Sequence, residues 1–420
     1  MIQKSIFVIF TIILSLQVFS SKHKANNSND FMLAGRNLSY FGVAGVIIGT
    51  LVGGASTIGT VQMAYYYGIA GVIFTLGSGI ACFILGLFFT NKLYDNKITT
   101  VTEFIGNYFG DRFKKISSFF STLGIYIHII AQIIASGAIV SFFFNTNIVI
   151  GSFISSLLIL TYSVYGGVKG SSVIGKIKIF VIYIVMTVSF VEAFRHSGLE
   201  IFDKLPKNIN WFSLFSYGKK KAIFDIVFMI IGVLSTQVYL QAIFSAKSKK
   251  DAILGSLLSA VLIPPIGFLG VYVGMYVRAN GFATQSGAEV LPYFISTHFP
   301  SVFSSIILSF ILFIILGTAS GLVVGVTTNI FKDFLSKFNF KNEINVIRLV
   351  NTIVVFTSFL IVLLGMQSKI LKWSYLSMGI RGSIIFLPLL SILYFGHKID
   401  FKKFELLYYI LFIVIIYYMI

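Results

Sequence analysis

Charged residues are scarce in this chain, and acidic residues are the scarcest of them. Only 11% of the 420 residues are charged, with 14 Asp and Glu against 32 Lys and Arg. Soluble domains contain about 25% charged residues. Hydrophobic residues make up 57% of the chain, and the mean hydropathy is +0.93. The composition excludes a sizeable soluble domain. It predicts an integral, multi-pass protein of the cell's inner or plasma membrane, in contact with the lipid bilayer.

Residues that carry enzymatic chemistry are also missing. Cys82 is the single cysteine, which excludes a disulfide framework and a cluster of thiol metal ligands. The sequence contains no HExxH, no GxSxG and no GxxxxGK[ST] motif. We therefore expect that the protein is not an enzyme and does not hydrolyse ATP.

The formal net charge of +18 does not indicate a nucleic-acid partner. The basic residues stand in short gaps between apolar runs, as the positive-inside rule predicts for cytoplasmic loops. Alternate gaps are the richer ones, with Lys219, Lys220 and Lys221 as an exception. We expect the richer gaps on the cytoplasmic side, both termini outside, and no binding of nucleic acid.

Twelve apolar windows are long enough to cross a bilayer, which takes about 20 residues. Residues 1–20 are either a retained helix or a cleaved signal peptide, and the length of the apolar stretch favours the helix. The polar gap 96–120 resembles an amphipathic helix at the membrane surface. The windows are 2–19, 41–66, 69–94, 116–144, 147–165, 174–194, 222–245, 252–277, 302–331, 346–366, 373–396 and 404–420.

Glycine and hydroxyl residues interrupt the window 41–66 in its middle. Gly53, Gly54, Ser56 and Thr57 follow the apolar run VAGVIIGTLV. Each glycine inside a helix costs about 1 kcal/mol relative to alanine, and hydroxyl groups offer the backbone competing hydrogen bonds. We predict a broken membrane helix, by which transporters expose backbone groups to a solute or an ion. The alternative is that the glycines only let helices pack closely.

The second half of the chain also contains stretches rich in glycine and hydroxyl residues. Gly232 and Gly317 are candidates for further helix breaks, which would fit a diverged structural repeat. Gly317 and Thr318 belong to a window, residues 313–333, that is rich in small and hydroxyl residues. A threonine oxygen suits a hard cation such as sodium, whereas a tight seam between two helices is the alternative.

Ionisable side chains inside apolar windows are costly and therefore mark candidate sites. His128, with Gln132 one turn later, faces either a cavity or a structural hydrogen-bond partner. Arg381 lies well inside the window 373–396. It is a candidate to bind a substrate carboxylate, with pairing to a backbone carbonyl as the alternative.

Five segments, spread over residues 30–335, occur in the order that a known family has them. The segments are DFMLAGRNLSYFGVAG, STIGTVQMAYYYGIAG, VYGGVKG, TQVYLQAIFSAKSKKDA and GTASGLVVGVTTNIFKDF. They resemble the sodium:solute symporters, which include sodium-coupled proline, pantothenate and sugar carriers. The resemblance implies an all-α leucine-transporter fold, in which two inverted five-helix repeats, here about 41–194 and 222–396, form a core over 37–400. Extra helices would lie in 1–36 and 401–420.

The resemblance also implies a sodium site between the first and eighth core helices. The carbonyl ligands would come from Gly49, Val52 and Ile314, and the two hydroxyl positions fall on Gly317 and Thr318. Thr318 keeps its oxygen, but Gly317 has none. Sodium is therefore the expected coupling ion at a site that lacks one ligand.

A second departure follows the VYGG segment. The family usually carries an acidic residue there, close to the sodium path, whereas this chain has Gly175 and Lys176. We hypothesise that Lys176 acts as a built-in cation, which would make proton coupling possible because a buried lysine shifts its pKa readily. The alternative is that Lys176 only marks the cytoplasmic end of a helix.

The resemblance places the substrate among the first, third, sixth and eighth core helices. A small organic anion or an amino acid fits better than a sugar, because Met229 and Gly232 stand where sugar carriers have Asn and a gating Tyr. We expect sodium-coupled symport by alternating access. A proton-coupled transporter and a degenerate domain that acts as a sensor or partner subunit are the alternatives. The candidate substrate residues are Gly53, Gly54, Ser56, Thr57, His128, Gln132, Met229, Gly232 and Ser235.

Overall fold

The computed structural model describes most of the chain as helix. The described residues are 2–20, 27–96, 98–282, 287–338, 340–364, 370–396, 405–406, 408–410 and 412–413. The longer helices are α1 (Ile2–Ser20), α3 (Tyr40–Leu51), α5 (Ile73–Ile84), α8 (Asp111–Phe144), α9 (Ile148–Ser197), α11 (Lys219–Leu234), α13 (Lys249–Ala279), α15 (Ser301–Asn329), α16 (Glu343–Leu363) and α17 (Ile370–Phe395). The shorter ones are α2 (Ser28–Leu33), α4 (Thr60–Tyr67), α6 (Thr90–Leu93), α7 (Val101–Phe109), α10 (Ile201–Lys204), α12 (Gln237–Phe244) and α14 (Val290–His298).

Among the described residues, eight helical segments are long and apolar enough to cross a membrane. One of them, Ala55–Asn96, contains a turn at Gly68, where φ is +63°. Three shorter apolar helices, Gln3–Ser15, Tyr40–Leu51 and Ile148–Val164, accompany them. Each expected window from 2–19 to 373–396 falls on helix, and most of 404–420 lies outside the described residues. The protein is thus an integral, multi-pass membrane protein, while the count of twelve crossings stays a prediction.

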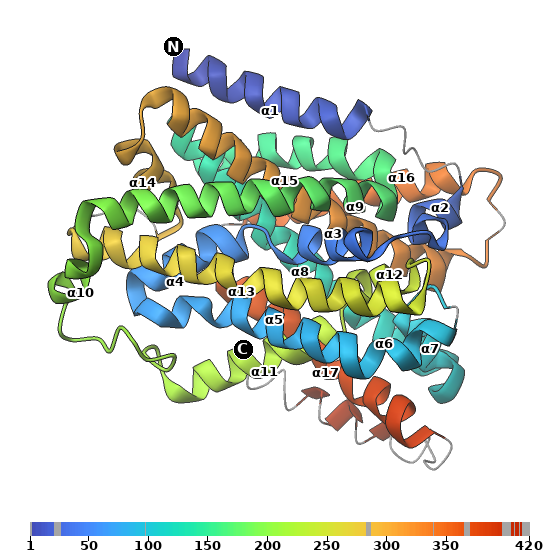
Figure 1. Ribbon diagram of the computed structural model, residues 1–420. Coiled ribbons are helices and arrows are strands. Elements are labelled where there is room, and N and C mark those ends of the chain that lie inside the picture. The colour runs from blue at the N-terminus through green and yellow to red at the C-terminus, as the bar shows by residue number, and fades with distance from the viewer. Residues whose placement is uncertain are drawn as a thin grey trace.

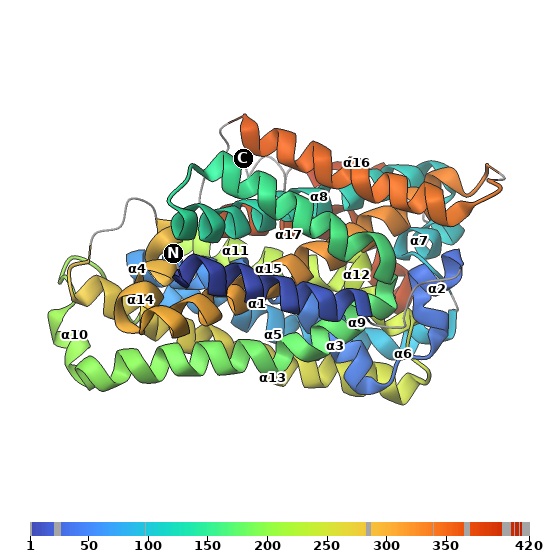
Figure 2. The ribbon, with the colours of Figure 1, turned by 90° about the horizontal axis from the view of Figure 1, so that it is seen from above.

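The long helices lie side by side in one bundle (Figure 1), and the view from above agrees (Figure 2). Both views show α10 and α14 at one end of the bundle and α2 and α7 at the other. The bundle centre is formed by α8 and α15, whose most apolar windows are 83% and 89% buried. The corresponding windows of α13 and α16 are only 39% buried, as expected of helices that face lipid.

Two helices are interrupted near mid-length, one in each half of the chain. The first break separates α3 from α4 and contains a π-helical turn, η2 (Ala55–Gly59). The second separates α11 from α12 at Ser235 and Thr236, where Thr236 is extended (φ −83°, ψ 121°). By contrast α15 runs unbroken through Gly317, so the expectation of a third break there is wrong. Gly317 serves close packing instead, as described below.

The sharp bend within α9 occurs at Gly167, in the VYGG segment, where φ is +52°. A side chain on Gly167 would place its Cβ only 2.5 Å from the backbone oxygen of Phe31 in α2. Glycine is required both for this conformation and for this approach. The bend divides α9 into the two windows expected at 147–165 and 174–194.

The gap 96–120 contains the short helix α7, which the single residue Gly110 separates from α8, while its location at the membrane surface stays a prediction. A hydroxyl N-cap starts it: Thr100 accepts a hydrogen bond from the backbone N–H of Glu103, and Glu103 accepts one from Thr99. The arrangement differs from a capping box in that Glu103 bonds to the residue before the N-cap and not to the N-cap itself.

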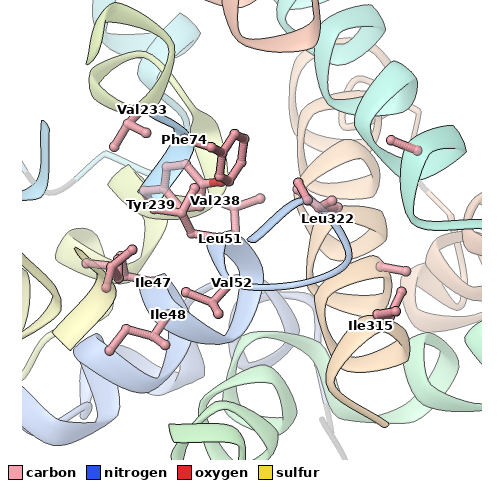
Figure 3. Close-up of a cluster of buried hydrophobic side chains, with 14 of the residues drawn as sticks. Ile47, Ile48, Leu51, Val52, Phe74, Val233, Val238, Tyr239, Ile315 and Leu322 are labelled. Carbon is pink, nitrogen blue, oxygen red and sulfur yellow. The ribbon is translucent and has the colours of Figure 1, made fainter. Parts of the chain in front are cut away.

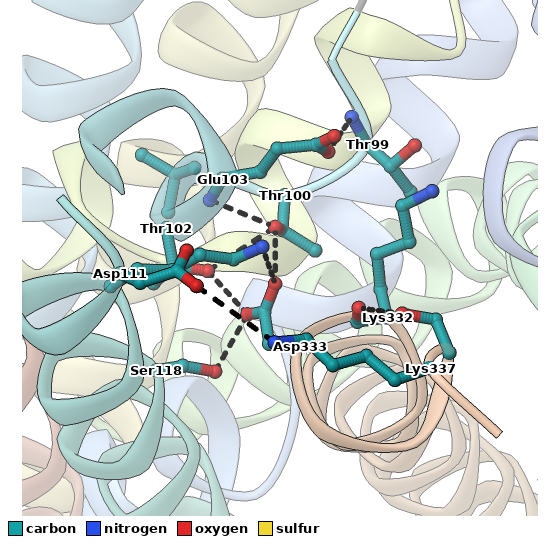
Figure 4. Close-up of polar contacts among 12 residues, drawn as sticks. Thr99, Thr100, Thr102, Glu103, Asp111, Ser118, Lys332, Asp333 and Lys337 are labelled. Atoms are coloured by element: carbon teal, nitrogen blue, oxygen red, sulfur yellow. Dashed lines mark hydrogen bonds and ion pairs between the residues drawn. The ribbon is translucent and has the colours of Figure 1, made fainter. Parts of the chain in front are cut away.

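A buried carboxylate fastens α7 and α8 to the end of α15 (Figure 4). Asp333, in the π-helical segment η8 (Ile330–Leu335), accepts hydrogen bonds from Thr100 (3.0 Å), Thr102 (2.5 Å) and Ser118 (2.6 Å). Lys114 lies 3.7 Å from the same carboxylate. We call these five residues the Asp333 cluster, and it closes the end of the bundle where α2 and α7 lie.

Candidate functional site

Side chains bond to several backbone groups at the break between α3 and α4. The N–H of Gly54 donates to Oε1 of Gln132 on α8 at 2.8 Å. The hydroxyl of Thr57 donates to the carbonyl of Gly53 at 2.8 Å, and that of Ser56 to the carbonyl of Leu51 at 3.2 Å. The expected substrate residues Ser56 and Thr57 therefore bond to their own helix in this structure.

Gly53 is enclosed by two neighbouring helices. A Cβ on Gly53 would lie 2.5 Å from Oγ1 of Thr318 on α15 and 2.7 Å from Oε1 of Gln132 on α8. A Cβ on Gly54 would lie 2.4 Å from that of Ala135. Both glycines are therefore needed for close packing at the break. The sequence allowed either a broken helix or a tight helix–helix seam here, and the structure has both.

Thr318 brings together all the oxygen atoms that the sequence resemblance implies for a cation site. Its Oγ1 lies 2.9 Å from the carbonyl oxygen of Val52, 3.1 Å from that of Gly49 and 3.3 Å from that of Ile314. These atoms come from the broken end of α3 and from α15. These four residues are the ones that the resemblance implies, and their role in binding a cation stays a prediction.

A lysine lies in the middle of this group, and it is Lys178. Its Nζ is 2.6 Å from the carbonyl oxygen of Gly49 and 2.6 Å from Oγ1 of Thr318. The side chain is fully buried, and none of the ion pairs among the described residues includes it. Because the lysine donates to Thr318, the threonine hydroxyl is left to donate to Val52, the nearest carbonyl.

The sequence-based hypothesis placed the built-in cation at Lys176, two residues before this position. Lys176 is partly exposed and lies along α3, where its Cγ would be 3.2 Å from a Cβ on Gly45. Helical periodicity distinguishes the two lysines only once the contact of Gly175 with α3 is known. Residues three or four apart share a helix face, so Ser171, Gly175 and Lys178 point toward α3 together.

Glycine at position 175 is the reason that Lys178 reaches Gly49. A Cβ on Gly175 would lie 1.7 Å from the backbone oxygen of Gly45, and one on Gly49 would lie 2.9 Å from Cα of Gly175. The two backbones are therefore in direct contact. This approach brings the next turn of α9, with Lys178, against the end of α3.

A second group of buried polar atoms lies on the other side of the break. On α17, Nη2 of Arg381 is 3.3 Å from Nδ1 of His128 on α8, and both side chains are fully buried. A guanidinium group can only donate, so Nδ1 accepts and the imidazole proton resides on Nε2. Gln132, which binds Gly54, follows His128 by one turn on the same face.

Several donors in this group have no acceptor among the described residues. They are Nε and Nη1 of Arg381, Nε2 of His128 and Nε2 of Gln132. No carboxylate in the described part of the chain forms an ion pair with Arg381. We call Arg381, His128 and Gln132 the donor cluster. It presents positive charge and N–H groups inside the bundle.

The expected residues of α11 lie close to this cluster through α17. A Cβ on Gly232 would lie 2.5 Å from that of Met378, whose sulfur is 3.0 Å from Nη2 of Arg381. Met229 packs toward Gly77 on α5. Ser235 lies at the second break, and its hydroxyl is buried without a partner among the described residues.

Buried hydrophobic side chains line the break between α3 and α4 (Figure 3). Leu51, Phe74 and Tyr239 gather on one side of the break, and Ile315 and Leu322 of α15 lie on the other. Phe74 also contacts His128, with ring centroids 6.4 Å apart. Lys178, Thr318 and the donor cluster are fully buried, so both groups of polar residues are closed to solvent in this conformation.

The sequence matches a known protein family over most of its length. A model of the sodium:solute symporter family matches residues 31–397. The chain is 23% identical over 273 residues to high-affinity choline transporter 1 of Drosophila melanogaster, covering 62% of this chain and 44% of that protein. It is 24% identical over 197 residues to a sodium/glucose cotransporter of Vibrio parahaemolyticus, covering 44% and 36%. The chain thus spans less than half the length of these relatives.

Solved structures match over nearly the whole chain. A Na⁺-coupled sialic acid symporter in an outward-open state superimposes with a TM-score of 0.76 at 17% identity, covering 99% of this chain and 96% of that one. A transporter of the nucleobase-cation-symport-1 family in a closed conformation gives a TM-score of 0.60 at 14% identity, covering 91% and 85%. At these identities the likeness shows the fold, and it confirms the expected leucine-transporter architecture.

Proposed function

Because the chain belongs to the sodium:solute symporter family, we propose that it is a secondary active transporter that moves a small organic anion or amino acid across the membrane by alternating access. The observation that carries the substrate class is the unpaired guanidinium of Arg381 inside the bundle. A buried charge without a partner is strongly unfavourable. Ionisable residues within a membrane protein therefore mark substrate or ion paths.

The donor cluster favours an anion over a neutral sugar. Its free atoms are donors, at Arg381, His128 and Gln132. A carboxylate is an acceptor-only group and forms charge-assisted, two-pronged hydrogen bonds with a guanidinium. A sugar hydroxyl needs acceptors as well as donors, and Oε1 of Gln132 is already bonded to Gly54. The cluster thus complements a carboxylate.

The two broken helices supply the remaining parts of a transport mechanism. Gln132 joins the donor cluster to the backbone of the first break, and Gly232 joins it to α11 just before the second. A solute that binds Arg381 thereby contacts helices of both halves of the chain. Family membership supports sodium as the coupling ion, whereas Lys178 contacts two of the atoms that would bind it. Solute binding and sodium dependence therefore need separate experiments.

The test of solute binding uses the full chain in lipid nanodiscs. Thermal unfolding is followed in the presence of amino acids, small mono- and dicarboxylates and neutral sugars. A ligand at 100 times its Kd stabilises the folded state by about 2.7 kcal/mol. We expect a carboxylate to raise Tm in the wild type and not in Arg381→Gln, with Arg381→Lys intermediate because lysine keeps the charge but not the fork.

Two results would contradict this proposal. One is stabilisation by a sugar that Arg381→Gln retains. The other is binding of a carboxylate without any counterflow of that solute in proteoliposomes, which would favour a sensor or partner subunit over a transporter. Counterflow that is lost in Arg381→Gln, with an unchanged melting curve in the absence of solute, would support it.

A further inference from the structure

We propose that the amino group of Lys178 permanently takes the place of the coupling sodium ion between α3 and α15, so that this protein binds no sodium there. The inference deepens the transport function proposed above and rests on it for its role in a cycle. The ion-binding property itself can be measured without any solute.

The position of the nitrogen carries the argument. Nζ lies 2.6 Å from two of the implied ligand atoms, the carbonyl oxygen of Gly49 and Oγ1 of Thr318. The same Oγ1 lies within 3.3 Å of the other two, the carbonyls of Val52 and Ile314. A cation bound to these oxygens would have to occupy the volume of the nitrogen. Lysine is a donor without acceptor capacity, so it can bond to the oxygens but cannot act as a ligand.

Lys178 also explains why position 317 has no hydroxyl group. A Cβ on Gly317 would lie 3.0 Å from Cδ of Lys178 and 2.7 Å from Cγ2 of Ile174. Contacts this short would force the lysine stem to move. A serine or threonine at position 317 would therefore crowd Ile174 and the stem of Lys178, and glycine at this position leaves room for both.

The missing acid at position 175 completes the exchange. Only glycine permits the contact of α9 with Gly45 and Gly49. Replacing the acid removes a negative charge from the ion path, and the turn that follows supplies a positive one. The loss of the hydroxyl at position 317 and the loss of the acid at position 175 thus have one explanation. The amino group of Lys178, which is part of the chain, replaces a sodium ion that would bind and leave.

The experiment restores the sodium site. In the double variant Lys178→Ala/Gly317→Ser the nitrogen is removed and a hydroxyl is supplied at the vacant ligand position. Thermal unfolding of the full chain in nanodiscs is measured in NaCl and in KCl at equal ionic strength, without solute, and binding of radioactive sodium is measured in parallel. We expect no sodium-specific shift in the wild type and a rise in Tm of several degrees in the double variant.

Lys176→Ala is the matched control for Lys178→Ala, since it removes the neighbouring lysine and leaves both Lys178 and Gly317 in place. We expect it to show no response to sodium. If the double variant does not fold, Lys178→Ala alone is used, with Thr318 as the remaining hydroxyl ligand and sodium binding as the readout.

The proposal is overturned by a sodium-specific shift in the wild type that Thr318→Ala abolishes. It is equally overturned by a folded Lys178→Ala or double variant that binds no sodium. A shift that survives Thr318→Ala agrees with it, because sodium would then bind elsewhere. Failure of the solute experiment leaves these results unaffected, so the two proposals can fail independently.

Discussion

The side-chain oxygen of Gln132 accepts a hydrogen bond of 2.8 Å from the backbone N–H of Gly54. This bond joins α8 to the first turn after the helix break. It fixes the broken backbone beside the donor cluster, of which Gln132 is a member.

Removing this acceptor should destabilise the break. In Gln132→Ala the N–H of Gly54 is left buried without a partner, which costs about 1–3 kcal/mol. The measurement is the thermal or denaturant midpoint of the full chain without solute. In Gln132→Glu an acceptor oxygen remains, so we expect a smaller loss. Equal losses in the two variants would show that the bond to Gly54 does not stabilise the fold.

The Asp333 cluster should contribute more to stability than an exposed ion pair. In Asp333→Asn one of the acceptor oxygens becomes a donor, so at least one of the hydroxyls of Thr100, Thr102 and Ser118 loses its bond. We expect a loss of about 1–3 kcal/mol and faster hydrogen exchange in α7. Hydrogen–deuterium exchange with mass spectrometry measures the latter.

Asp111→Asn provides the control for this cluster. Asp111 lies 3.8 Å from Lys337, and both side chains are largely exposed, 77% and 65%. Exposed pairs contribute about 0–1 kcal/mol. The role of the cluster would be refuted by an equally small effect of Asp333→Asn.

The contact of α3 with α9 can be tested by a pair of glycine substitutions. Gly175→Ala would place a methyl group 1.7 Å from the backbone oxygen of Gly45. Overpacking of this kind costs about 1–3 kcal/mol or more. Gly170→Ala, in the same helix, meets nothing within 4 Å and should be neutral or stabilising by up to about 1 kcal/mol. The melting midpoints of Gly175→Ala and Gly170→Ala are compared with that of the wild type. Similar midpoints for the two variants would rule out the close approach of α9 to α3.

His298, at the end of α14, should make stability depend on pH. Burial lowers the pKa of His298 below its ordinary value of 6.5. The imidazole contacts Tyr276 at 2.9 Å and stacks on Phe294, and His196 lies beside it. The unfolded chain therefore binds a proton at a higher pH than the folded one.

The sign follows from proton linkage. The contribution of His298 is fully present above its unfolded pKa and is lost as the pH falls toward the lower folded pKa. We expect the Tm of the wild type to fall more than that of His298→Gln between about pH 7.5 and about pH 5. Parallel pH profiles of the two proteins would exclude this group as the cause.

Local sequence patterns were sufficient to predict much of the fold. Apolar windows and glycines are properties of short stretches, and so the helices and the break at Gly53 follow from composition and backbone chemistry. The oxygens of Gly49, Val52 and Ile314, which the resemblance implies as ligands, lie within 3.3 Å of the hydroxyl of Thr318. The expectation of a break at Gly317 failed because tertiary contacts, here with Ile174 and Lys178, can use a glycine without bending the helix.

What the sequence determined by itself was the membrane class, the family and the neighbours of the candidate cation site. Only the tertiary structure decided which lysine enters that site, because the rotation of α9 is set by the contact of Gly175 with Gly45 and Gly49. It also brought Arg381 to His128 across 253 positions of sequence. Both pairings depend on how whole helices pack, and a helix's own residues specify which face is polar but not which partner that face will meet.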